Sequence, residues 1–175
     1  SELADESFSI VIDGLKPRET YRVEMFLSDY YCINAPMLLA HDGLWKSTAT
    51  FVSDKNGIID MSQTPSCSGS YEGISTMGLF SNAKPLTNKK KKLPNSLSEI
   101  PLLDHFFVDI KIMQGNTVIA ERTFTRHYMS SQISHKDIYG KYFQGRLFYD
   151  KKAIKTPALI IVSAVSYTHL RAHET

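Results

Sequence analysis

Alternation of apolar and polar residues with a period of two is the feature that most constrains the fold of this chain. Residues 7–13 and 20–27 both show it, as expected for β-strands whose two faces meet different surroundings. Gly14-Leu-Lys-Pro17 separates them and supplies turn residues, because Gly tolerates positive φ and Pro fixes φ at about −65°. We therefore predict a first hairpin. The residues predicted to face inward are Phe8, Ile10, Ile12, Tyr21, Val23 and Met25.

Two further hairpins are predicted on the same grounds. Residues 46–52 are rich in β-branched side chains, and a short turn containing Gly57 leads from them into residues 58–61. Residues 105–113 and 117–125 flank a tight Gln-Gly-Asn turn and give the clearest hairpin signal in the chain.

The remaining segments complete an all-β pattern. Residues 145–149 and 157–163 are predicted to form a last pair of strands, whereas residues 126–144 have no decisive period. Residues 62–85 and 88–101 are rich in Gly, Pro and Ser and are typical of loops. No segment shows an apolar stripe of helical length, so the pattern favours an immunoglobulin-like β-sandwich.

Composition excludes several classes of protein. The net charge is only +2, from 20 basic and 18 acidic residues, so no nucleic-acid partner is expected. The longest apolar run, residues 158–162, is far below the roughly 18 residues of a membrane span. Cys32 and Cys67 do not make a disulfide framework, which favours a reducing, cytoplasmic location. Lys89–Lys92 is interpreted as a solvated loop, with phosphate contact as the alternative.

Candidate catalytic and metal-binding residues are sparse. His105, His127 and His135 lack the spacing of a metal site, so neither a metal nor a cofactor is expected. Cys67 has no helical pattern after it, as a nucleophile elbow would require, and Ser70 is not in a Gly-x-Ser-x-Gly motif. We therefore expect no catalytic residue in this chain.

The last eleven residues, 165–175, differ in character from those before them. They read Val-Ser-Tyr-Thr-His-Leu-Arg-Ala-His-Glu-Thr, which is the translation of a common transposase sequencing adapter. We interpret them as read-through from a library fragment and exclude them, with His169 and His173, from the argument. Native sequence is expected to end near Ser163 or Ala164.

Four ordered segments resemble one known family. They are residues 14–17, 44–51, 57–61 and 69–80, of which the last, with its Gly-Ser-Tyr-x-Gly motif, is the most specific. Their order and spacing are similar to the amino-terminal domain of the acyl-CoA thioesterase / bile acid-CoA:amino acid N-acyltransferase family. The signature residues on which the resemblance depends are Gly14, Trp45, Gly57, Asp60, Gly69, Ser70, Tyr71, Gly73 and Gly78.

The resemblance implies a domain organisation and a function. In that family a β-sandwich precedes an α/β-hydrolase domain, so residues 1–140 would be the sandwich and 141–164 the truncated start of the hydrolase domain. The chain would then lack the nucleophile, and acyl-CoA would meet only the missing domain, on which the sandwich packs. The parent protein would hydrolyse acyl-CoA or transfer the acyl group to an amino acid, and the fragment does not choose between these outcomes.

Other interpretations stay open. The 69–80 loop could pack on the hydrolase domain and frame its acyl pocket, but we favour a structural role, with Trp45 in the core and Gly69 and Gly73 in tight turns. A different class altogether is an immunoglobulin-like interaction module of a bacterial surface or secreted protein. Misfolding of the isolated fragment is a third possibility, because residues 158–162 would be an apolar edge without its sheet.

Overall fold

A computed structural model describes residues 3–28, 44–86, 104–155 and 157–161. Within these ranges the chain is built from β-strands and one short helix, α1 (Gly78–Ser81), which confirms the all-β prediction. No helix of the described part is long and apolar enough to cross a membrane. Cys32, the lysine run 89–92, the predicted native end at 163–164 and the tail 165–175 lie outside the described residues.

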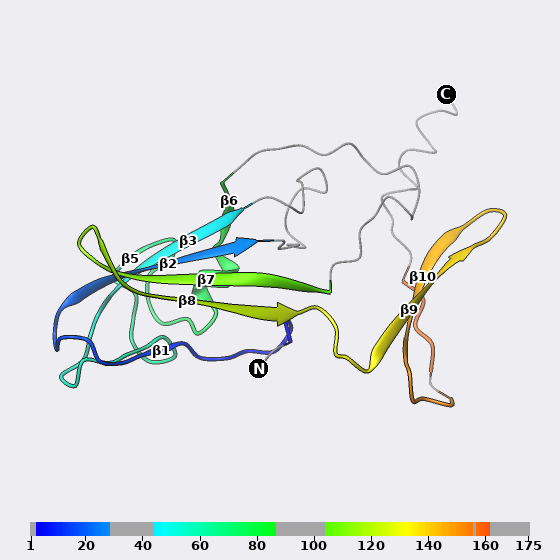
Figure 1. Cartoon of the computed structure of the whole chain (residues 1–175), viewed down its shortest axis with the longest axis horizontal. Coiled ribbons are helices and arrows are strands. Elements are labelled where there is room, and N and C mark those ends of the chain that lie inside the picture. Colours follow the sequence, from blue (N-terminus) through cyan, green and yellow to red (C-terminus); the bar gives the residue numbers. More distant parts are fainter. Residues whose placement is uncertain (1–2, 29–43, 87–103, 156, 162–175) are drawn as a thin grey trace, which may run out of the picture.

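A six-stranded antiparallel sheet dominates the molecule (Figure 1). Its order is β5-β3-β2-β7-β8, with β6 also paired to β3. The third predicted hairpin is confirmed, since β7 and β8 pair along their length around the turn at Gly115. The strands are β2 (Thr20–Ser28), β3 (Trp45–Val52), β5 (Ser68–Gly69), β6 (Lys84–Pro85), β7 (His105–Gln114) and β8 (Thr117–His127).

Every second residue of the three central strands enters one core. The inward directions predicted for Tyr21, Val23 and Met25 are confirmed, and all three are buried. Phe8, Ile10 and Ile12 are half-buried and pack against the same core, so their predicted alternation also holds. The side of the sheet that carries these buried residues is called the inner face below, and the opposite side the outer face. Further buried members are Leu27, Trp45, Ala49, Phe51, Ile59, Met61, Leu79, Phe106, Val108, Ile110 and Ile112.

The first two predicted hairpins are wrong. Strand β1 (Val11–Ile12) pairs with β4 (Ile59–Asp60) in a second, small sheet, and neither pairs with the strand next to it in sequence. The turns at 14–17 and 54–57 therefore carry the chain between two layers instead of folding it back in one sheet (Figure 1). Turn residues specify where a chain reverses, but partner choice depends on which apolar faces meet across the core.

The two turns between layers bind each other through backbone groups. Leu15 N–H donates to the Gly57 carbonyl at 3.1 Å, and Arg18 N–H donates to the Asp54 carbonyl at 3.2 Å. The Ser53 hydroxyl, which is buried, donates to the Lys16 carbonyl at 2.7 Å. The pair of turns, called the double corner below, closes this end of the two layers as one unit.

The carboxyl-terminal part is a separate hairpin of β9 (Ile133–Tyr139) and β10 (Gln144–Asp150), which lies beside the far end of β8 (Figure 1). The predicted pairing of 145–149 with 157–163 is therefore wrong, because β10 pairs with β9 and residues 157–161 form no strand. An apolar run such as 158–161 needs strands on both sides to form a central strand, and the described residues offer it none.

Candidate functional site

The segment most specific to the family resemblance forms a closed loop at the β3 edge of the sheet. Ser66 and Gly73 exchange backbone hydrogen bonds at 2.9 Å in both directions. The buried Ser66 hydroxyl lies 3.0 Å from the Ser68 carbonyl and 2.9 Å from the Tyr71 carbonyl, within the loop. Gly73 has φ +85°, a conformation that L side chains rarely adopt, so glycine suits the closing position.

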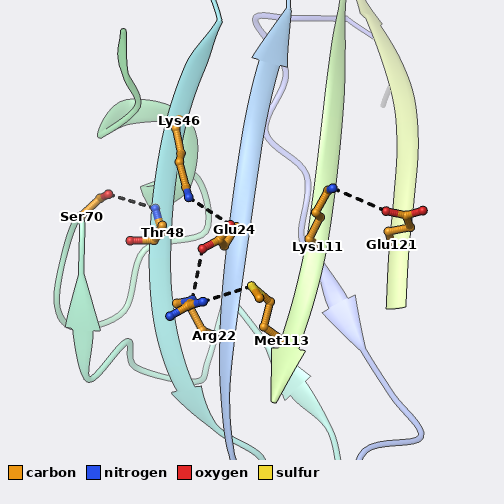
Figure 2. Close-up of polar contacts among 8 residues, drawn as sticks. All are labelled: Arg22, Glu24, Lys46, Thr48, Ser70, Lys111, Met113 and Glu121. Carbon is orange, nitrogen blue, oxygen red and sulfur yellow. Dashed lines mark hydrogen bonds and ion pairs between the residues drawn. The ribbon is translucent and has the colours of Figure 1, made fainter. Parts of the chain in front are cut away.

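Ser70 is used for strand pairing. Its N–H donates to the Thr48 carbonyl at 2.7 Å, and its Oγ accepts the Thr48 N–H at 3.0 Å (Figure 2). Gly69, just before it, approaches β3 so closely that a Cβ would lie 2.4 Å from the Thr48 carbonyl oxygen. The Gly-Ser pair thus fastens the loop to β3, and the partner of the Ser70 hydroxyl among the described residues is a backbone N–H.

Tyr71 and Gly78 fit each other. A Cβ at Gly78 would lie 2.4 Å from the Tyr71 ring, so the ring occupies the space that a side chain would need. Burial raises the pKa of the Tyr71 hydroxyl above its ordinary value. Leu79 and Phe80, which follow in α1, are buried in the core. The 69–80 loop is therefore fastened to the core at one end and to β3 at the other.

Asp60 organises the turn after β4. Its Oδ1 accepts hydrogen bonds from the Ser62 hydroxyl at 2.6 Å, the Ser62 N–H at 2.9 Å and the Ser9 hydroxyl at 2.8 Å. These bonds, chiefly those from Ser62, lower the pKa of the Asp60 carboxyl. Trp45 is buried at the start of β3, and Gly14 and Gly57 have φ of +73° and +75° in the double corner.

The outer face of the main sheet carries compensating charges. Glu24 lies 3.2 Å from Arg22 and 3.0 Å from Lys46, and Lys111 lies 3.7 Å from Glu121 on the neighbouring strands (Figure 2). Lys46 also sits 4.9 Å above the ring of Phe26. Such a face is typical of an antiparallel sheet that has its core on one side and water on the other.

The histidines are not brought together into a metal site. The His105 Nδ1 lies 2.5 Å from the Asp104 carboxylate, and the His105 and His127 rings are 5.8 Å apart. His135 lies in the separate hairpin, where it faces Phe148. Across the described ranges, no group of three or more His, Cys, Asp or Glu residues could hold a metal ion. Cys67 has an exposed, free thiol.

The β9–β10 hairpin presents an apolar surface to solvent. Tyr142 is 87% exposed and Ile154 is 98% exposed, and the other exposed large apolar side chains from residue 138 to 161 range from 39% to 85%. A cross-strand ion pair, in which Arg146 Nε lies 2.6 Å from Asp137, contributes to the hairpin itself. Sequence reasoning missed this hairpin, because its strands alternate too weakly to show a period. The exposed residues include Ile138, Tyr139, Phe143, Leu147, Phe148, Tyr149, Leu159, Ile160 and Ile161.

Comparison with known proteins agrees with the segments picked out from the sequence. Residues 5–139 match the family described as "Acyl-CoA thioester hydrolase/BAAT N-terminal region". Acyl-coenzyme A thioesterase 5 of Mus musculus is 26% identical over 132 residues, which are 72% of this chain and 28% of the relative. Bile acid-CoA:amino acid N-acyltransferase of Mus musculus is 25% identical over 153 residues, 85% of this chain and 34% of the relative.

A third relative, Acyl-coenzyme A amino acid N-acyltransferase 1 of Mus musculus, is 30% identical over 83 residues, which are 47% of this chain and 18% of the relative. The chain thus spans about a fifth to a third of the length of these relatives.

Proposed function

This chain belongs to the family of acyl-CoA thioester hydrolase/BAAT N-terminal regions, and from that membership we propose that it is the non-catalytic amino-terminal domain of an acyl-CoA-processing enzyme. Its two layers, residues 3–128, would form an immunoglobulin-like sandwich. Strand β10 and the apolar residues after it would begin an α/β-hydrolase domain. Acyl-CoA would bind to that second domain, and the parent protein would catalyse hydrolysis or transfer to an amino acid.

The exposed apolar hairpin is the observation that carries this proposal. Large apolar surfaces on a soluble domain mark a place where another part of a protein packs, and the exposed side chains here are concentrated after β8. The predicted boundary at residue 140 would fall in the turn between β9 and β10. The family match ends at residue 139, which supports a boundary in that turn.

Packing of the sandwich on the hydrolase domain also belongs to the proposal. The outer face is an improbable interface, because burying its paired charges would cost desolvation free energy. The hairpin exposes many large apolar side chains, whose burial would be favourable. The 69–80 loop is a second candidate contact, since Ile74 projects from it and is 61% exposed.

The rival interpretation, a free-standing interaction module of a surface or secreted protein, gains no support from the matched family. A cytoplasmic location stays a prediction, consistent with the free thiol of Cys67. Localising the tagged parent protein in cells of its source would test it.

Hydrolysis assays test the non-catalytic role. The purified chain is expected to release no free thiol from acyl-CoA, and no p-nitrophenol from p-nitrophenyl esters, above the blank. A full-length thioesterase serves as the positive control. Turnover that disappears in Cys67→Ala or Ser70→Ala would overturn the proposal, because either result would place a nucleophile in this chain.

Reading the genomic sequence beyond codon 164 tests the second domain. We expect a Gly-rich loop to follow the apolar run, and a Ser or Cys nucleophile elbow with Asp and His partners much later. A stop codon or another sandwich at that point would instead restore the module interpretation.

A further inference from the structure

An apolar groove of about 760 Å³ runs between the amino-terminal segment (residues 3–13) and the sheet, along β7 and β8. Ile110 and Ile112 of β7 lie on its sheet side, and both are almost completely buried. Phe8 and Phe124 lie at one end, with their rings 5.7 Å apart. The groove exists because the second layer is narrower than the main sheet and leaves the first half of β8 uncovered.

The direction of each side chain decides the chemistry of this groove. In β8, Ala120, Arg122 and Phe124 are in register with the inward residues Ile112, Ile110 and Val108, so they face the groove. Glu121 also borders the groove, but it is in register with Lys111 and pairs with it on the outer face (Figure 2).

The opposite wall follows the same alternation. Phe8, Ile10 and Ile12 pack toward the core, and the exposed Asp13 also lines this wall of the groove. Arg122 is the charged residue of the lining whose register in β8 directs it toward the groove, beside the apolar side chains of both walls.

Two arginines on the same face of β8, Arg126 and Arg122, differ in exposure and in hydrogen-bond partners. Arg126 is 1% exposed, donates to the carbonyl oxygens of Leu3 and Glu6, and stacks 4.4 Å above the ring of Phe8. Arg122, four residues earlier in β8, is exposed and has no hydrogen-bond acceptor or ion-pair partner among the described residues. The amino-terminal segment supplies acceptors to Arg126, and no described residue supplies one to Arg122.

We propose that this groove binds the aliphatic chain of a long-chain carboxylate, with the carboxylate on Arg122. The guanidinium offers the planar pair of donors that a carboxylate accepts. The isoleucine and phenylalanine side chains offer the chain an apolar surface. This proposal stands on the geometry of the groove and does not depend on the presence of a hydrolase domain.

Binding of lauric acid to the 175-residue chain tests the proposal. Titration calorimetry should show one saturable site, and ¹⁵N–¹H spectra should shift at Ile110, Ile112, Ala120 and Phe124. Dodecanol, which has the same chain without the charge, should bind about tenfold more weakly, as expected for loss of a charged hydrogen-bonded contact. Dodecylamine should not bind.

Two variants locate the site. Arg122→Gln should weaken laurate about tenfold and leave dodecanol unchanged, because only the charged contact is lost. Ala120→Trp should abolish laurate binding by filling the groove. Thr123→Trp is the matched control, since Thr123 lies on the same strand but on the outer face in register with Asp109, and it should bind laurate normally. Circular dichroism confirms that each variant is folded.

Several outcomes would overturn the proposal. They are absence of saturable binding, unchanged laurate affinity in Ala120→Trp, and equal affinity for dodecanol and laurate. Shifts at the groove residues that depend on protein concentration without ligand, together with a dimer in sedimentation, would show that a second copy of the chain occupies the groove instead.

Discussion

The two-layered part (residues 3–128) and the β9–β10 hairpin are both antiparallel β-structure, yet they differ in how they treat apolar side chains. In the layered part, Leu27 is 0% exposed and shares its core with three strands and α1. In the hairpin, Leu147 of β10 is 46% exposed, although its strand is fully paired. Backbone pairing therefore does not produce a core. A strand pair gains stability from its faces only when another layer covers them.

The two regions also differ in what covers their apolar side chains. The layered part buries its apolar residues against elements of the same chain and directs its compensated charges to the outer face. The hairpin has internal pairing and one good ion pair, but its covering layer is not among the described residues. Such a difference is what the proposed two-domain organisation of the parent protein would produce.

The largest expected difference in stability is between two leucine-to-alanine substitutions, one in each region. Leu27→Ala should lower the free energy of unfolding by about 2–5 kcal/mol, because it leaves a cavity in the core. Leu147→Ala should change it by less than about 0.5 kcal/mol. Urea unfolding followed by the fluorescence of Trp45 measures both. Similar losses in the two variants would mean that the hairpin is packed in solution.

A glycine pair probes the double corner, with a somewhat smaller expected effect. At Gly57 a Cβ would lie 1.9 Å from the Leu15 carbonyl oxygen, and φ is +75°. Gly57→Ala should cost about 2–4 kcal/mol from backbone strain and crowding together. Gly115 has φ +59° but open space around it, so Gly115→Ala should cost only about 1–2 kcal/mol. Equal melting temperatures for the two variants would argue against contact between the corners.

Lowering the pH is expected to have the smallest effect on stability. It tests the two regions separately, because each has a carboxyl group with a lowered pKa. Hydrogen bonds from Ser62 lower the pKa of Asp60, and the bond from Arg146 lowers the pKa of Asp137. A lowered folded-state pKa stabilises the protein above the unfolded value of about 3.9, and this stabilisation is lost as the pH falls through the folded pKa.

The matched variants are Asp60→Asn and Asp137→Asn. The first should flatten the decline in global stability between about pH 5 and pH 2, measured by urea unfolding. The second should leave that profile unchanged and reduce only hydrogen-exchange protection in β9 and β10. A global effect from Asp137→Asn would show that the hairpin and the layered part unfold together.

Sequence patterns predicted the faces of strands better than their partners. Alternation identified Tyr21, Val23 and Met25 as core residues, because burial on one side of a sheet imposes the period directly on the chain. It also predicted the β7–β8 hairpin, whose two strands pair directly around the turn at Gly115. Partners that lie in another layer leave no local trace, which is why β1 and β4 were assigned to the wrong neighbours.

The candidate site was partly predictable as well. The sequence identified the glycines at 57, 69 and 78 as signature positions. It could not show why glycine is needed there, because the atoms that leave no room for a Cβ belong to Leu15, Thr48 and Tyr71, which lie elsewhere in the chain. The groove had a weaker signal: Arg122 occupies an inward position in an alternating strand, where an apolar residue is the norm. Its width depends on how far the second layer extends, and no local pattern encodes that.

The double corner has a consequence for how this fold can vary in length. Surface turns are usually where proteins accept inserted or deleted residues. Here the turns at 14–17 and 54–57 share backbone hydrogen bonds, so changing the length of one removes partners from the other. By contrast, sixteen residues, 29 to 44, connect β2 to β3, although these two strands pair with each other. Natural variation in length within the family should therefore accumulate between β2 and β3 and avoid the short turns.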